Sequence, residues 1–80
     1  MFVVFALDRR TGRASIPEVN VPSFTLVERL LADHTNMTDV EVAKFHDTVM
    51  HDGIAEKTHK DDEPGRYDVT VLYEFKPDNW

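Results

Sequence analysis

Hydrophobic and polar positions divide the chain into three strand-like stretches and two helical ones. Residues 2–7 (FVVFAL) are apolar at successive positions, which is typical of a strand buried on both faces. Residues 14–21 predict a second strand whose apolar phase shifts at Pro17. Because proline cannot donate to a ladder, we expect this strand at a sheet edge or with a bulge. Residues 67–75 alternate cleanly and predict a third strand with one face on the core.

A first helix is predicted to begin at Pro22 and Ser23, because the apolar residues that follow recur at the spacing i, i+1, i+4, i+5. Thr25 and Glu28 have the spacing of a capping box, and Ser23 is a competing cap. The expected buried stripe consists of Leu26, Val27, Leu30 and Leu31.

A second helix is predicted over about residues 39–52. Thr38 and Glu41 form a second candidate capping box, and Met37 and Val42 occupy the two hydrophobic staple positions around it. We expect the buried side of this helix to consist of Val42, Phe45, Val49 and Met50.

These elements assemble into a single α+β domain over residues 1–80, in the order ββααβ. The doubly apolar first strand belongs in the centre of a three-stranded sheet of order 2-1-3, with both helices packed on one face. The third strand has two possible directions, and we expect the antiparallel one because antiparallel pairs are the commoner kind. Residues 56–65 are expected to form an acidic flexible loop, and residues 76–80 a tail.

Composition excludes several classes of function. With no cysteine among its 80 residues, the chain can form neither disulfides nor thiolate zinc sites. No apolar run approaches the roughly 20 residues that a membrane span needs. In the opening MFVVFALDRR the charges follow the apolar residues, the reverse of a secretory signal. We therefore expect a soluble, cytoplasmic protein without a cofactor.

The stretch HDTVMHDG, residues 46–53, looks most like a chemical site because it repeats a His-Asp pair. On the predicted helix, however, His46 lies inside the apolar arc, whereas His51 lies near the opposite side and in the last turn. Gly53 suits the left-handed residue that ends a helix. The interpretation is one packing residue and one helix-end cation, with no metal site. Since no nucleophile, phosphate-loop or calcium-loop motif is present either, the sequence predicts no enzyme.

Charge is distributed unevenly along the chain, whose net charge is −6. Residues 33–63 carry nine acids against three lysines, and the positive charges gather near the N-terminus. This pattern predicts a non-catalytic module that docks on a basic surface of a larger protein. The residues expected to make the contact are Asp39, Asp47, Asp52, Glu56, Asp61, Asp62 and Glu63.

Small size, acidity and ββααβ order suggest an analogy with the inhibitors and adaptors that phages direct against host polymerases, nucleases or CRISPR complexes. An acidic face on such a protein would imitate nucleic-acid phosphates. Because an acidic chain repels phosphate, direct nucleic-acid binding is unfavourable unless Arg9, Arg10 and Arg13 act as a separate contact. Trp80 is a further candidate contact residue.

Two other interpretations remain open at the level of sequence. A homodimeric regulatory subunit could pair through an exposed sheet edge. A pH sensor is the other, because four histidines lie among the acids.

Overall fold

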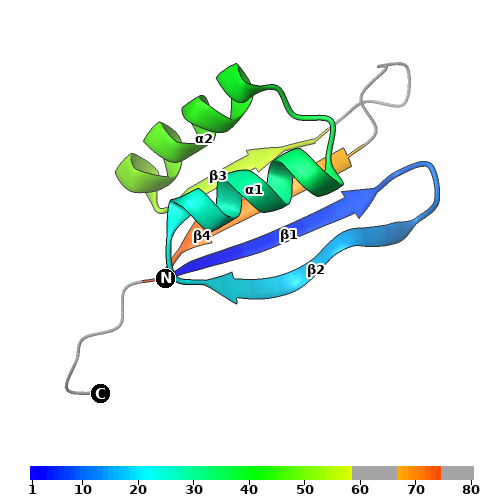
Figure 1. Ribbon diagram of the computed structural model, residues 1–80, viewed down its shortest axis with the longest axis horizontal. Coiled ribbons are helices and arrows are strands. Elements are labelled where there is room, and N and C mark those ends of the chain that lie inside the picture. Colours follow the sequence, from blue (N-terminus) through cyan, green and yellow to red (C-terminus); the bar gives the residue numbers. More distant parts are fainter. Residues whose placement is uncertain (59–66, 75–80) are drawn as a thin grey trace.

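The structure is a computed structural model that describes residues 1–58 and 67–74 (Figure 1). Within them the chain forms four strands and two helices in the order ββααββ. The elements are β1 (Phe2–Asp8), β2 (Arg13–Val21), α1 (Phe24–His34), α2 (Asp39–Asp52), β3 (Ile54–Lys57) and β4 (Tyr67–Tyr73).

The described strands make one antiparallel sheet of order β2-β1-β4-β3. The central position of β1 is confirmed, and so is its antiparallel pairing with the strand predicted over residues 67–75. The prediction of three strands is wrong, because β3 adds a fourth beside β4 and occupies the start of the expected loop. Only four residues long, β3 carries little periodicity of its own, so its pairing with β4 decides its conformation.

Strand β2 is an edge strand with an irregular register, as Pro17 predicts. Its pairing with β1 shifts on both sides of Ala6. Ile16 pairs with Ala6 and Val19 with Val4, so both β2 side chains lie on the core face although three positions separate them. The extra residue around Pro17 makes this possible, because strict alternation would place them on opposite faces.

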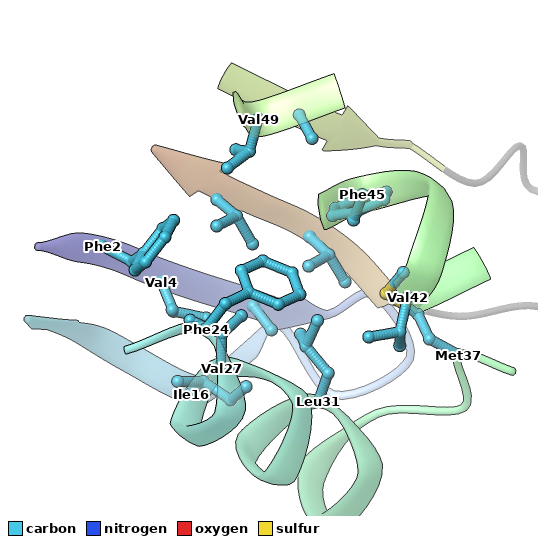
Figure 2. Close-up of a cluster of buried hydrophobic side chains, with 14 of the residues drawn as sticks. Phe2, Val4, Ile16, Phe24, Val27, Leu31, Met37, Val42, Phe45 and Val49 are labelled. Carbon is cyan, nitrogen blue, oxygen red and sulfur yellow. The ribbon is translucent and has the colours of Figure 1, made fainter. Parts of the chain in front are cut away.

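Both helices cover the same face of the sheet (Figure 1). The core lies between the two layers, and Figure 2 shows its side chains converging from helices and strands. From β1 it takes the even-numbered Phe2, Val4 and Ala6, and from the helices it takes the completely buried Val27, Leu31 and Val49, among others. The class predicted from the sequence, a small α+β domain, is confirmed.

The odd-numbered residues of β1 point away from the helices. Val3, Phe5 and Leu7 do not belong to the core cluster, and Phe5 is 37% exposed. Leu72 of β4 pairs with Val3, and Ile54 of β3 pairs with Leu72, so both lie on the same outer face. Val3 is nevertheless only 8% exposed, so the expectation that β1 is buried on both faces is confirmed at Val3 and is wrong at Phe5.

The predicted buried stripes are confirmed in part: Val27 and Leu31 of α1 are buried, as are Val42, Phe45 and Val49 of α2. On α1, Phe24 is buried while Leu26 is 39% exposed and Leu30 is half-buried. Phe24 makes an edge-on contact with the ring of Phe2, at 5.4 Å between ring centroids. This anchor turns Val27 and Leu31 toward the sheet and Leu26 outward. On α2 the prediction that Met50 is buried is also wrong, since its side chain is 54% exposed.

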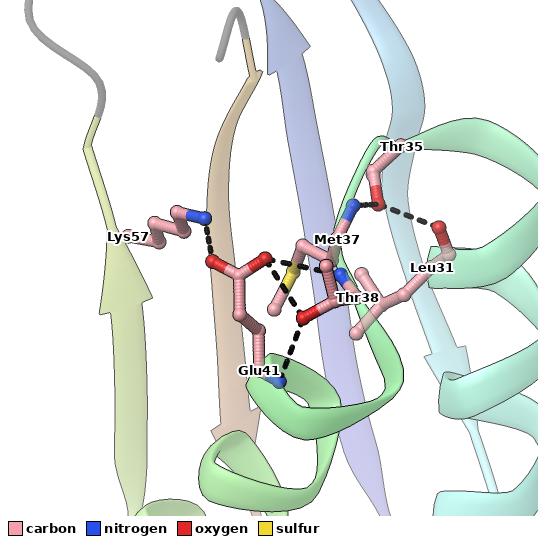
Figure 3. A network of polar contacts seen from close by, with 6 residues as sticks. All are labelled: Leu31, Thr35, Met37, Thr38, Glu41 and Lys57. Carbon is pink, nitrogen blue, oxygen red and sulfur yellow. Dashed lines mark hydrogen bonds and ion pairs between the residues drawn. The ribbon is translucent and has the colours of Figure 1, made fainter. Parts of the chain in front are cut away.

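The capping box of α2 is confirmed, together with the residue that ends the helix. Thr38 accepts a hydrogen bond from the Glu41 backbone, and the Glu41 carboxylate accepts one from the Thr38 backbone (Figure 3). Gly53 is left-handed (φ 82°) and its N–H donates to the Val49 carbonyl. The box predicted for Thr25 does not form, because α1 begins one residue after Ser23.

No helix within residues 1–58 and 67–74 combines the length and the apolar composition needed to cross a bilayer.

Candidate protein-interaction surface

Negative charge in the described structure gathers on the helical layer, residues 23–53. This layer holds six acids against Arg29 and Lys44, which leaves four net negative charges. The described remainder, which is the sheet with its turns and ends, holds five acids against four bases. The acids of the helical layer are Glu28, Asp33, Asp39, Glu41, Asp47 and Asp52. The two layers therefore differ in charge much more than in size.

A shallow groove runs along α1 beside the first turns of α2. We call it the α1–α2 groove; it is lined by Thr25, Glu28, Arg29, Ala32, Asp33, Met37, Asp39, Val42 and Ala43. Ala32, Met37, Val42 and Ala43 supply its apolar surface, and three carboxylates from the two helices line it together with one basic side chain, Arg29. A shallow apolar channel with acidic walls suits a long cationic side chain, whose methylene stem and charged head need different surroundings.

The acids predicted for docking on α2 do not share one face. Asp39 lies in the α1–α2 groove. At 3.6 residues per turn, Asp47 lies about 80° around the helix from Asp39, and Asp52 about 140°. Both are exposed, and the Asp52 carboxylate contacts Nδ1 of His51 at 2.6 Å. The three residues thus belong to one charged layer but not to one contact patch.

The remaining predicted acids lie elsewhere. Glu56 pairs with Thr70 in the register of β3 and β4, which puts it on the sheet face turned away from the helices. Asp61, Asp62 and Glu63 lie outside the described residues, and so does Trp80. Among the predicted acids that the structure describes, Asp39 alone lines the groove.

Two groove acids, Glu28 and Asp33, were not among the docking residues chosen from the sequence. Glu28 was assigned to a capping box with Thr25, which would have occupied its side chain at the start of α1. Because Ser23 is the N-cap instead, Glu28 projects from the middle of the helix into the groove. A helical wheel for α1 anchored on the buried Phe24, Val27 and Leu31 would have found this position.

Glu41 belongs to the acidic layer by sequence but has structural partners. Besides the capping box, its carboxylate forms an ion pair with Lys57 of β3 (Figure 3). Both side chains are about two-thirds buried, at 33% and 27% exposure. This contact ties the start of α2 to the edge of the sheet.

The arginines predicted as a secondary contact lie at the β1–β2 turn. Asp8 organises this turn by accepting hydrogen bonds from Arg10 N–H at its side chain and from Gly12 N–H at its carbonyl. Arg9 lies 3.8 Å from Asp68 of β4 and so forms an ion pair. Arg10 and Arg13 are exposed.

The two histidines of the HDTVMHDG stretch face different surroundings. His46 is exposed, contrary to the prediction, and its ring stacks on Phe24 at 4.4 Å between centroids, bridging the helices. At the end of α2, the hydrogen bond and the charge of Asp52 raise the pKa of His51 above its ordinary 6.5. Among the described residues, no three histidines or acids converge in a way that could hold a metal ion.

No family model, curated protein or solved structure matches this chain.

Proposed function

We propose that this protein is a non-catalytic protein-binding module whose helical layer docks on a basic surface of a larger partner. The observation that carries the proposal is the concentration of net negative charge on one layer, together with an acid-lined apolar groove inside it. Because the groove lies within the negatively charged layer, electrostatic attraction would bring a basic partner to the surface that also has a concave shape to receive a side chain.

A lysine or arginine of the partner is the complementary side chain. Its stem would lie on Ala32 and Ala43, and its charged head would reach Glu28, Asp33 or Asp39. The remaining acids of the layer act at longer range by steering a positive surface toward the groove. Because such steering is screened within about 8 Å at physiological salt, binding should weaken as salt rises.

The partner class in this proposal is a nucleic-acid-binding protein of the same cell, such as a polymerase or a nuclease. Its phosphate-binding surface is basic by necessity, and an acidic layer would occupy it by imitating phosphates. The module would then act in the cytoplasm as an inhibitor or an adaptor.

The test is affinity capture from the native host with two matched variants of equal charge change. The groove variant carries Glu28→Gln, Asp33→Asn and Asp39→Asn. The sheet variant carries Glu18→Gln, Glu56→Gln and Glu74→Gln, which remove the same charge outside the helical layer. We expect a basic protein to be captured by the wild type and the sheet variant, and to be lost with the groove variant.

Equal loss with both variants would show that net charge rather than the groove governs binding. Undiminished capture by the groove variant would contradict the proposal outright. All six substituted residues are exposed, so the fold should tolerate the changes. Circular dichroism of all three proteins checks that the fold is intact.

The second candidate function is phosphate binding at the β1–β2 turn. It is favoured by the exposure of Arg10 and Arg13 at a turn away from the helical layer (Figure 1). Titration with labelled single-stranded DNA at low and moderate salt tests it. Salt-sensitive binding that Arg10→Ala and Arg13→Ala remove would support this candidate, and absence of binding at micromolar protein would eliminate it.

A further inference from the structure

The sheet face turned away from the helices is an apolar surface that no described element covers. We call it the open sheet face; its apolar residues are Val3, Phe5, Leu7, Ile54 and Leu72. Phe5 is 37% exposed and Ile54 is 38% exposed, Leu7 and Leu72 are half-buried, and Val3 is shielded by its neighbours. Val3, Leu72 and Ile54 form a continuous row across β1, β4 and β3, because they are successive partners in the register.

The sequence of β1 is the pattern of a strand with protein on both sides. A central strand with one face in water normally alternates between apolar and polar residues, whereas FVVFAL does not. By contrast, Asp68 and Thr70 of β4, and Glu56 of β3 opposite Thr70, give the open face some polar character. The exposed apolar surface therefore comes mainly from Phe5 and Ile54, with polar side chains beside them, as in an interface with a polar border.

Both edges of the sheet are poorly suited to pairing with another strand. At one edge β2 contains Pro17 and an irregular register, and at the other β3 is only four residues long and ends with Glu56 and Lys57. Proline, bulges, short strands and charges are the means by which proteins protect sheet edges. An additional chain would thus meet the face of the sheet rather than extend it.

Charge indicates which way two copies of this chain could meet. Contact through the helical layers would oppose four net negative charges on each copy. Face-to-face packing of the sheets, about 10 Å apart, would place the helical layers on the outside, with their axes about 30 Å from one another. That distance exceeds the screening length of about 8 Å at physiological salt. On the open sheet face itself, Asp68 is already paired with Arg9, and Glu56 lies at the β3 edge.

We propose that the open sheet face is a homodimer interface, on which a second copy of this chain packs sheet against sheet. Four strands about 4.8 Å apart and about seven residues long make a face of about 19 by 23 Å. When two such faces pack together, their corrugated surfaces together lose on the order of 1,200 Å² of solvent-accessible area. This area lies at the lower end of the range for specific protein interfaces. We therefore expect a weak dimer, with a dissociation constant on the order of micromolar or weaker, in which both helical layers stay accessible.

Sedimentation equilibrium of the full chain from about 1 to 500 µM tests the proposal, because this range spans the expected dissociation constant. The wild type should move from the monomer mass of 9.2 kDa toward twice that mass. Phe5→Lys and Ile54→Lys should each remain monomeric. Leu26→Lys is the matched control, since Leu26 is equally exposed, at 39%, but lies on α1. It should dimerise like the wild type.

Salt separates this interface from the docking surface of the proposed function. Raising the salt screens the repulsion between copies of charge −6, so dimerisation should hold or strengthen while partner binding weakens. If Phe5→Lys does not fold, two measurements still test the interface. One is the mass of Ile54→Lys, and the other is an isotope-filtered NOE spectrum of mixed labelled and unlabelled wild type, which detects contacts between copies. Contacts between the Phe5 ring of one copy and open-face methyl groups of the other are expected.

Three results would overturn the proposal. One is a constant monomer mass for the wild type at every concentration. The others are dimerisation that Phe5→Lys and Ile54→Lys leave unchanged, and dimerisation that Leu26→Lys alone abolishes.

Discussion

At the scale of single residues, the two helix starts differ in how they are capped. Thr38 accepts a hydrogen bond from the Glu41 backbone, whereas the Ser23 side chain makes no capping bond. Thr38→Ala should therefore lower the free energy of unfolding by about 1 kcal/mol. Ser23→Ala should change it by only a few tenths, since no cap bond is lost. Urea denaturation measures both, and equal losses would contradict the assignment of the caps.

His51 supplies a pH-dependent contact at the end of α2. Because Asp52 raises the pKa of His51 in the folded state, the protonated form stabilises the fold. This contribution is fully present below the ordinary pKa of 6.5 and is lost as the pH rises through the folded-state pKa. In an NMR titration the His51 midpoint should fall in Asp52→Asn and stay in place in Asp47→Asn. An unchanged midpoint in Asp52→Asn would refute this explanation.

Residue-level predictions succeeded where a local hydrogen bond or a backbone conformation decided the outcome. The Thr38–Glu41 box and the left-handed Gly53 depend on neighbours within four residues, so sequence contains the necessary information. Burial of Met50 and Leu26 was predicted wrongly because the rotation of each helix depends on contacts from other elements. Phe24 packing on Phe2 is such a contact, and nothing in the helix alone reveals it.

At the scale of elements, α1 has two leucines whose environments are opposite. Leu31 is completely buried between helix and sheet, and Leu26 is 39% exposed. Leu31→Ala should lower the free energy of unfolding by about 2–5 kcal/mol, through lost apolar burial and the cavity left behind. Leu26→Ala should cost less than about 1 kcal/mol, because much of its side chain already lies in water. Denaturation of both variants checks the rotation assigned to α1.

Strand β3 shows where element prediction from sequence reaches its limit. Long segments with a strong period, such as β1, β4 and α2, were found with nearly the right bounds. The four residues of β3 follow directly after Gly53, and their pairing with β4 supplies the stabilisation. The alternation of β4 indicates that strand but not its partner, and four residues are too few for β3 to show a period of its own.

At the scale of the whole molecule, the two layers have separate surfaces. The helical layer carries most of the described net charge, and the open sheet face carries most of the exposed apolar residues of the sheet. Sequence predicted the acidic bias but not its grouping. Glu56 was assigned to the same surface as Asp39, yet the β3–β4 register places it on the opposite face of the sheet. Only the assembled fold brings Glu28, Asp33 and Asp39 to one groove.

The most direct measurement of the central claim is chemical-shift mapping of the labelled wild-type protein with a short arginine-rich peptide as the basic probe. The account predicts that the largest shifts cluster along the α1–α2 groove, at Glu28, Ala32, Asp33, Asp39 and Ala43. They should shrink as salt rises. Shifts of similar size over the helical layer and the sheet, or shifts confined to the sheet, would contradict it.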